Sequence, residues 1–300
     1  MVPPGGLDAS LTSAMIPGVM GQADAEPARL FLECAMQEGE VHSCASGEAL
    51  VFSTRSPAAE HANEDAAALI PLDPGRCVLA VADGVGGARS GAQAAGRALR
   101  KLADALLASR GEPDLRGAIL DGIERASRAV RELGVGAATT LAVVEIEDGR
   151  LRSYHVGDSE ILLVGQRGRL KLATLSHAPV AYAVEAGFVE ARDALHHEDR
   201  HLISNAVGAT DMRIEVGPST DLCARDTLLL GSDGLFDNLH RDEIVALVRS
   251  GPLPEVGRAL AGRARERMEG ADSRAPCKPD DLTFLLFRRT GHPRKDPARG

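Results

Sequence analysis

Residues 140–157 read "TLAVVEIEDGRLRSYHVG". The segments on either side of Asp148-Gly149 have the composition of β-strands, and Asp-Gly is a strong signal for a tight hairpin turn. A second pair of segments, "EILLVG" at 160–165 and "LKLATL" at 170–175, flanks another turn at 166–169. Strands joined by hairpins are antiparallel, whereas most strands of a parallel sheet are separated by helices. The sequence therefore predicts antiparallel sheet.

Helical patterns surround these strands. In 91–107 and in 114–133, apolar residues recur every three or four positions, which predicts two amphipathic helices. Further helical patterns cover 241–249 and 254–268, and apolar segments at 226–232 and 282–288 are typical of strands. Hairpin-linked strands around central helices favour an α+β layered fold. We expect one compact domain at 41–290, after a loose extension at 1–40 and before a disordered tail at 291–300.

Composition excludes several classes of protein. The net charge of −9 argues against a general nucleic-acid binder. Five cysteines without a Cys-x-x-Cys spacing argue against a disulfide framework or a thiolate zinc site. No apolar run is long enough to span a membrane, and no basic region precedes the apolar residues of the N-terminus. The sequence therefore predicts a soluble, cytoplasmic protein.

Carboxylates stand at the ends of four separate apolar segments. The residues are Asp83, Asp233, the pair Glu64-Asp65 and the pair Asp280-Asp281. Carboxylates gathered at a sheet edge repel one another unless a cation neutralises them. Mg²⁺ and Mn²⁺ prefer oxygen ligands, and a glycine after an Asp lets the backbone carbonyl approach such an ion. These segments predict a divalent metal site.

Six motifs in this order resemble the metal-dependent type 2C protein Ser/Thr phosphatases, in a bacterial-type form, over about residues 50–288. They are "NEDA", "VADGVGG", "ATTLAVV", "YHVGDSEILLV", "GSDGLFDNL" and "KPDDLTFLL". The resemblance implies a four-layer αββα sandwich, in which helices flank two antiparallel sheets. It also implies a hydrolase that uses two Mn²⁺ or Mg²⁺ ions, with a third possible, to activate a water that attacks the phosphorus of a phosphomonoester.

The resemblance assigns a role to each matching residue. Asp83 would bridge the two ions, the Gly84 carbonyl and Glu64 would complete one ion's shell, and Asp233 and Asp280 would hold the other ion. Asp83 and Asp233 are therefore the candidate catalytic residues. Asp65 belongs to the same metal-binding group and, like Asp158, is expected to support the ligands.

The sequence departs from the family pattern at four places. Glu60 replaces an Arg that holds the substrate phosphate in many relatives, and Arg55 or His61 are candidates to replace it. Val85 stands where many eukaryotic relatives have a His proposed as general acid, so water would protonate the leaving group. The usual "GDSR" ends here in Glu160. The usual Asp-Asn pair reads Asp-Asp at 280–281, which leaves the choice of ligand open.

Other functions fit less well. The segment "HEDRH" at 197–201 matches a zinc metalloprotease pattern, which requires a helix and a third ligand. "ADGVGGARSG" lacks the third glycine of a dinucleotide-binding loop, and no Cys is followed by the Arg of a thiol phosphatase. The remaining alternative is a pseudophosphatase that binds a phosphoprotein without turnover. We expect a partner that is a phosphorylated Ser/Thr protein, opposition to a Ser/Thr kinase, no binding to nucleic acid and no membrane span.

Overall fold

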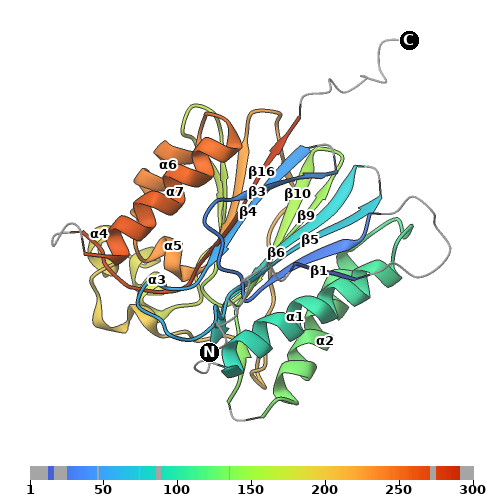
Figure 1. Cartoon of the computed structure of the whole chain (residues 1–300), viewed down its shortest axis with the longest axis horizontal. Coiled ribbons are helices and arrows are strands. Elements are labelled where there is room, and N and C mark those ends of the chain that lie inside the picture. Colours follow the sequence, from blue (N-terminus) through green and yellow to red (C-terminus); the bar gives the residue numbers. More distant parts are fainter. Residues whose placement is uncertain are drawn as a thin grey trace, which may run out of the picture.

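Two antiparallel sheets pack face to face in the computed structural model, and helices cover both outer faces (Figure 1). The structure describes residues 13–16, 26–45, 47–73, 75–85, 89–134, 136–270 and 275–290. This arrangement confirms the predicted α+β fold and its αββα layers.

The first sheet, here called sheet I, has the order β1-β2-β5-β6-β9-β10-β13, with β14 also paired to β10. Its strands are β1 Ser13–Ile16, β2 Ala28–Leu32, β5 Ala66–Asp73, β6 Arg76–Ala82, β9 Leu141–Glu147, β10 Arg150–Val156, β13 Glu215–Val216 and β14 Thr220–Asp221. The β9–β10 turn is the predicted hairpin. Both Asp148 (φ +46°) and Gly149 (φ +79°) have positive φ, as a type I′ turn requires.

The second sheet, sheet II, has the order β12-β11-β15-β16-β4-β3. Its strands are β12 Leu170–Ala173, β11 Glu160–Val164, β15 Thr227–Gly231, β16 Leu282–Arg289, β4 Gly47–Thr54 and β3 Glu40–Cys44. The predicted second hairpin joins β11 to β12. A separate short pair consists of β7 Gly84–Val85 and β8 Ala138–Thr139.

The N-terminal boundary differs from the expected one. Strand β2 lies inside the 1–40 extension, yet it pairs with β5 within sheet I, and its Leu30 is fully buried. The folded domain therefore includes residues well before 41. The strand was not predicted, because its partner β5 is not the next strand in the sequence and no hairpin turn marks the pair. The expected tail at 291–300 lies outside the described residues.

Two helices cover sheet I, α1 Arg89–Ala108 and α2 Arg116–Arg131. Their predicted apolar faces, including Leu99, Leu102 and Ile123, form a buried core with the outer face of that sheet. On the other side of the sandwich, α6 Arg241–Val248 and α7 Leu253–Met268 pack on sheet II (Figure 1). None of the described helices combines the length and the apolar composition needed to cross a bilayer.

The segment 178–204, here called the flap segment, lies between β12 and β13. It contains α3 Pro179–Glu185, α4 Ala191–Ala194 and the 3-10 helix η1 Glu198–His201. The short helix α5 Asp233–Phe236 directly follows strand β15 in the chain. It lies on the same side of the molecule as the flap segment (Figure 1).

Candidate active site

The four carboxylate segments meet at one edge of the sandwich, and each sheet contributes two of them. In sheet I, Ala66 at the start of β5 pairs with Ala82 at the end of β6, so Glu64-Asp65 and Asp83 lie side by side. In sheet II, Gly231 at the end of β15 pairs with Phe284 near the start of β16. This pairing brings Asp233 beside Asp280. Antiparallel pairing therefore explains why segments far apart in the sequence converge.

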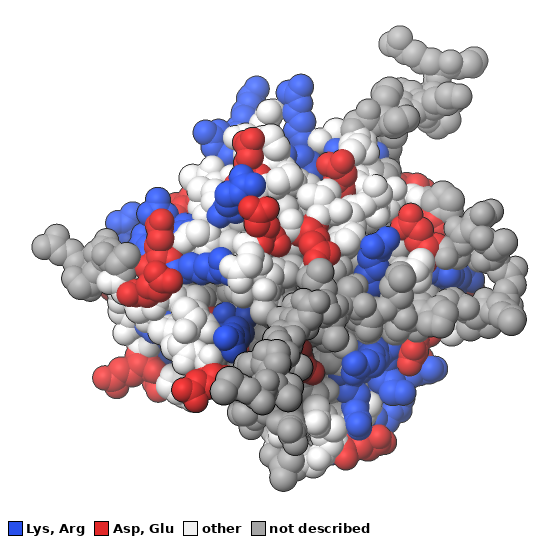
Figure 2. Space-filling view, viewed as in Figure 1, with Lys and Arg blue, Asp and Glu red and all other residues white. Residues whose placement is uncertain are grey.

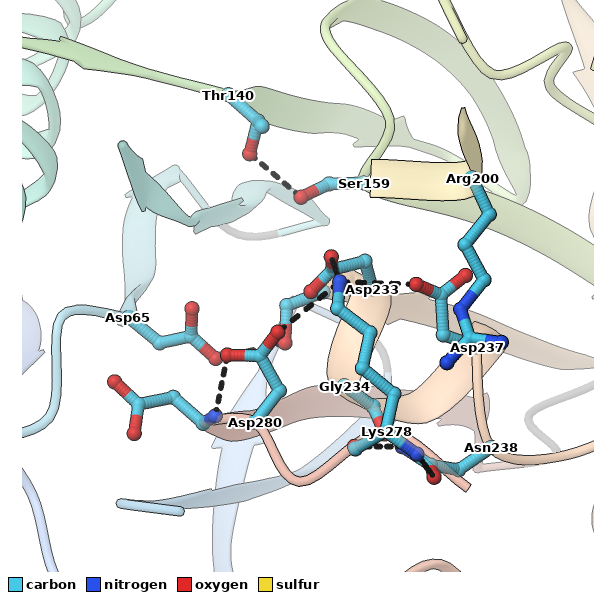
Figure 3. A network of polar contacts seen from close by, with 12 residues as sticks. Asp65, Thr140, Ser159, Arg200, Asp233, Gly234, Asp237, Asn238, Lys278 and Asp280 are labelled. Atoms are coloured by element: carbon cyan, nitrogen blue, oxygen red, sulfur yellow. Dashed lines mark hydrogen bonds and ion pairs between the residues drawn. The ribbon is translucent and has the colours of Figure 1, made fainter. Parts of the chain in front are cut away.

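Backbone contacts fix the position of Asp83. Its N–H donates to Thr140 Oγ1 (3.0 Å), and its carbonyl accepts from the Thr140 N–H (2.8 Å) and from Thr139 Oγ1 (2.8 Å). Thr140 Oγ1 also shares a hydrogen bond of 2.6 Å with Ser159 Oγ (Figure 3). Thr139 and Thr140, which directly precede strand β9, therefore fix the position of Asp83.

The first turn of α1 passes close to β7 and to Glu64. A Cβ on Gly91 would lie 2.7 Å from the carbonyl oxygen of Gly84 and even closer to Glu64 Oε1. The family resemblance assigned the Gly84 carbonyl and Glu64 to one ion, and oxygen atoms of both residues border this space. A glycine at 91 keeps this space open, and any side chain would fill it.

The two adjacent carboxylates at 280–281 have different surroundings. Asp281 is only 5% exposed and accepts hydrogen bonds from the backbone N–H groups of Ser56 (2.7 Å) and Glu64 (2.6 Å). Asp280 instead points toward the cluster, with its Oδ2 at 3.1 Å from Lys278 Nζ (Figure 3). Asp281 therefore links the loops at Ser56 and Glu64, whereas the Asp280 side chain lies beside Lys278.

Lys278 is the residue that the sequence analysis missed. Its ammonium contacts Asp233, Asp237 (3.0 Å) and Asp280 (3.1 Å), so one cation is surrounded by three carboxylates (Figure 3). Burial alone would lower the pKa of Lys278, but the charges of these carboxylates raise it above its usual value. The only signal in the sequence was its place in the "KPDD" motif.

Most carboxylates of the cluster, including two that contact Lys278, have raised pKa values. Burial, and then repulsion from neighbouring carboxylates, raises the pKa of Asp83 and Asp65 well above the usual range and that of Asp158 to about 8. The same causes raise the pKa of Asp237 and Asp280 to about 6. Such a cluster must bind either protons or cations. Its donors are all hard oxygen atoms, which is the ligand set that suits Mg²⁺ or Mn²⁺.

The comparisons with known proteins agree with this geometry. Residues 56–265 match the family described as Protein phosphatase 2C. The chain belongs to this family. Its relatives include the serine/threonine phosphatase Stp of Listeria monocytogenes, which is 29% identical over 248 residues, or 79% of this chain and 94% of the relative. The match confirms the family expected from the six motifs and identifies the chain as a hydrolase of the type 2C class.

Solved structures have the same architecture. A serine/threonine phosphatase of S. agalactiae superposes with a TM-score of 0.71 at 25% identity and covers 81% of this chain and 100% of its own. The catalytic domain of the phosphatase PstP, described in complex with 2 manganese ions, superposes with a TM-score of 0.63 at 24% identity. That match covers 80% of this chain and 96% of the PstP chain. The PstP likeness supports the fold of this phosphatase.

Asp65, which was expected to support the metal ligands, is anchored at the sheet edge of this type 2C phosphatase. Its side chain is buried and accepts a hydrogen bond of 2.7 Å from Ser232 Oγ.

Packing explains why a glycine stands at position 234, next to Asp233. A Cβ there would overlap the carbonyl oxygen of Asp281, so only glycine allows α5 to approach the start of β16.

The candidate phosphate-binding residues lie beside the cluster rather than in it. Arg55 is exposed at the end of β4, and among the described residues no hydrogen bond or ion pair links it to the carboxylates. His61 is closer, since its ring, Glu64 and Asp281 offer ligand atoms within 4.8 Å of one another. Its hydrogen bond to the Ala62 carbonyl raises the pKa of His61 above its usual value.

The structure also shows the surroundings of two sequence features noted above, Glu160 and the "HEDRH" segment. Glu160, which replaces the family's Arg, is buried and forms an ion pair with Arg241, and burial raises its pKa to about 7. The "HEDRH" segment forms the short 3-10 helix η1 instead of an α-helix. Neither His197 nor His201 belongs to a group of three potential metal ligands within the described part of the chain. The structure thus lacks the helix and the third ligand that a zinc protease site requires.

Proposed function

We propose that this type 2C phosphatase removes phosphate from phosphoserine and phosphothreonine residues of proteins with the help of two Mn²⁺ or Mg²⁺ ions. The observation that carries the proposal is the convergence of carboxylates from both sheets at one edge, where their pKa values are raised by burial and mutual repulsion. A cluster of this kind is stable in its charged form only when cations are bound to it.

The residues around the cluster would hold the ions in two groups. Glu64 and the Gly84 carbonyl, which flank the space kept open by Gly91, would hold one ion, and Asp233 and Asp280 would hold the other. Asp83 would contact both ions. When bound, the ions would neutralise the phosphoryl oxygens and make a coordinated water more acidic.

The protein itself would position the reactants. The contacts of Thr139 and Thr140 orient Asp83, and Asp281 holds the Glu64 backbone at the sheet edge. Val85 cannot donate a proton, so solvent would protonate the leaving oxygen. Arg55 and His61 remain the candidates for binding the substrate phosphate, and the position of His61 next to Glu64 favours His61.

The three buried cysteines would not act as nucleophiles in this reaction. Cys34, Cys44 and Cys77 are buried, and burial raises the pKa of Cys34 to about 11. Burial also raises the pKa of the Cys77 thiol well above its usual value. Thiols of this kind are poor nucleophiles at neutral pH.

The test measures hydrolysis of p-nitrophenyl phosphate and of a phosphothreonine peptide, with added Mn²⁺ and with EDTA. We expect turnover of both substrates with Mn²⁺ and none with EDTA. Equal turnover in the presence of EDTA would contradict the metal requirement. Binding of the phosphopeptide without turnover would favour the pseudophosphatase, although every expected metal-binding carboxylate is present. We further propose that the phosphatase acts in the cytoplasm, where it would oppose a Ser/Thr kinase.

A further inference from the structure

A cavity of about 440 Å³ lies between the flap segment and the region around α5 and α6. Asp158, Asp233 and Asp237 form one part of its wall, so the cavity is continuous with the proposed metal centre. Its volume falls within the roughly 300–1,000 Å³ that is typical of ligand sites. The proposed chemistry does not use this space.

Another part of the lining is apolar. Val180, Ala181 and Val184 lie on one face of α3, and Leu195 follows α4 and lines the same space. Residues three and four apart share a face of a helix, so these three side chains form an apolar stripe that lines the cavity. Phe236, from α5, lines the same cavity. The stripe has an open cavity in front of it, whereas the comparable stripes of α1 and α2 are buried in the core.

Some of the charged residues that line the cavity are engaged by partners within the protein. Glu160 is paired with Arg241. The guanidinium of Arg200 donates to the backbone carbonyls of Leu195 and Cys277, the latter at 3.1 Å. Glu185, Arg192 and Asp242 also line the cavity, but these three residues are exposed to solvent, which screens their charges. The cavity therefore suits an apolar group.

We propose that this cavity binds an apolar side chain of the phosphoprotein substrate, located a few residues from the phosphorylated Ser or Thr. The proposal rests on the proposed function and names a sequence preference for it. The occupant follows from continuity, because Asp233 belongs both to the cavity wall and to the proposed metal centre. A chain that places its phosphate at the carboxylate cluster must continue over the adjacent surface, where the residues of the cavity wall lie.

The test uses phosphothreonine peptides that are Ser-rich and carry a single Leu, moved through the four positions on each side of the phosphothreonine. We expect one Leu position to raise kcat/KM by about tenfold over the all-Ser peptide, mainly through KM, as burial of one aliphatic side chain predicts. The measured quantity is the ratio of kcat/KM for the best Leu peptide to that of the Ser peptide.

Two variants change the cavity in different ways. Val184→Asp places a charge in the apolar wall, and Ala181→Phe fills the space, so both should bring the ratio close to one. The matched control is Phe188→Ser, because Phe188 lies on the same flap segment but is 86% exposed and does not line the cavity. This control should keep the wild-type ratio. Thermal melting of each variant shows whether it is folded, and two independent variants guard against the loss of one.

Two results would overturn the inference while leaving the proposed function intact. One is turnover of all the peptides without preference for Leu at any position. The other is a preference that both cavity variants retain or that only Phe188→Ser removes. Absence of turnover of p-nitrophenyl phosphate by the wild-type protein with Mn²⁺ would instead contradict the proposed function, and the inference with it.

Discussion

At the scale of single residues, Asp83 is the most exacting test of the site. Asp83→Asn keeps the shape of the side chain and removes its charge, so we expect kcat with saturating Mn²⁺ to fall at least about a hundredfold. Folding should survive, because the change relieves repulsion among the carboxylates. The control is Asp121→Asn, since Asp121 forms an exposed ion pair with Arg125 on α2. A near-normal kcat in Asp83→Asn would show that the active site lies elsewhere.

The pair Asp280 and Asp281 offers a second test, in which two neighbouring carboxylates should behave differently. Asp280→Asn should weaken Mn²⁺ binding at least tenfold, measured by calorimetry, with little effect on the melting temperature. Asp281→Asn should mainly lower stability, by about 1 kcal/mol, because one of its two hydrogen bonds to backbone N–H groups is lost. The reverse pattern would assign the ligand role to Asp281.

Lys278 provides a third test, because its ammonium neutralises the cluster from within the chain. Lys278→Met should lower the melting temperature of the EDTA-treated protein, since three carboxylates lose their cationic partner. It should also raise the affinity for Mn²⁺ severalfold, because the ion no longer competes with an ammonium. Lys101→Met, at an exposed position of α1, should change neither quantity. An unchanged Mn²⁺ affinity in Lys278→Met would contradict this competition.

At the scale of elements, the first turn of α1 is shaped by the site. Ala is normally more favourable than Gly inside a helix, by about 1 kcal/mol. At Gly91, however, a Cβ would occupy the space between Glu64 and the Gly84 carbonyl. We expect Gly91→Ala to lower Mn²⁺ affinity at least tenfold, measured by calorimetry.

Gly96→Ala, five residues later in α1, is the matched control for Gly91→Ala. Its Cβ would meet no atom closer than 3.4 Å, so it should leave metal affinity unchanged and keep or increase stability. Equal metal affinities for the two variants would show that the space at Gly91 is not part of the metal site.

Elements with strong local patterns were predictable from the sequence. The Asp148-Gly149 hairpin and the Leu99 face of α1 follow from turn chemistry and helical periodicity, and both are confirmed. The meeting of the four carboxylate segments could be anticipated because each stands at the end of an apolar strand. The surroundings of Lys278 could not, because they depend on how the loop before β16 folds over α5. The Glu160–Arg241 pair joins residues 81 positions apart, beyond the reach of any local pattern.

At the scale of the whole molecule, charge is distributed over a mixed surface, with basic and acidic side chains interspersed on the face seen in Figure 2. The carboxylates at the sheet edge are different, because burial raises their pKa values. Burial raises the pKa of Asp158 in the folded protein to about 8, whereas an Asp in an unfolded chain has a pKa of about 4. The folded state therefore binds more protons between these values, and its stability falls as the pH rises.

This linkage predicts a specific pH dependence for Asp158→Asn in EDTA. The variant does not titrate at this position, so its stability relative to wild type should increase between pH 5 and pH 8. A tenfold change in acidity is worth about 1.4 kcal/mol, so we expect the difference to grow by at least about 1 kcal/mol. Urea denaturation at the two pH values measures it. A constant difference would show that Asp158 is ionised throughout this range.

Because the carboxylates come from both sheets, bound ions should affect how the protein unfolds. Asp83 is attached to sheet I, whereas Asp233 and Asp280 are attached to sheet II. An ion shared between them would act as a reversible cross-link across the sandwich, and the sheets could not separate until it dissociated. Bound ions should therefore lengthen the lifetime of the native state and protect the chain from proteases, because the escape of the ion would become part of the barrier to unfolding.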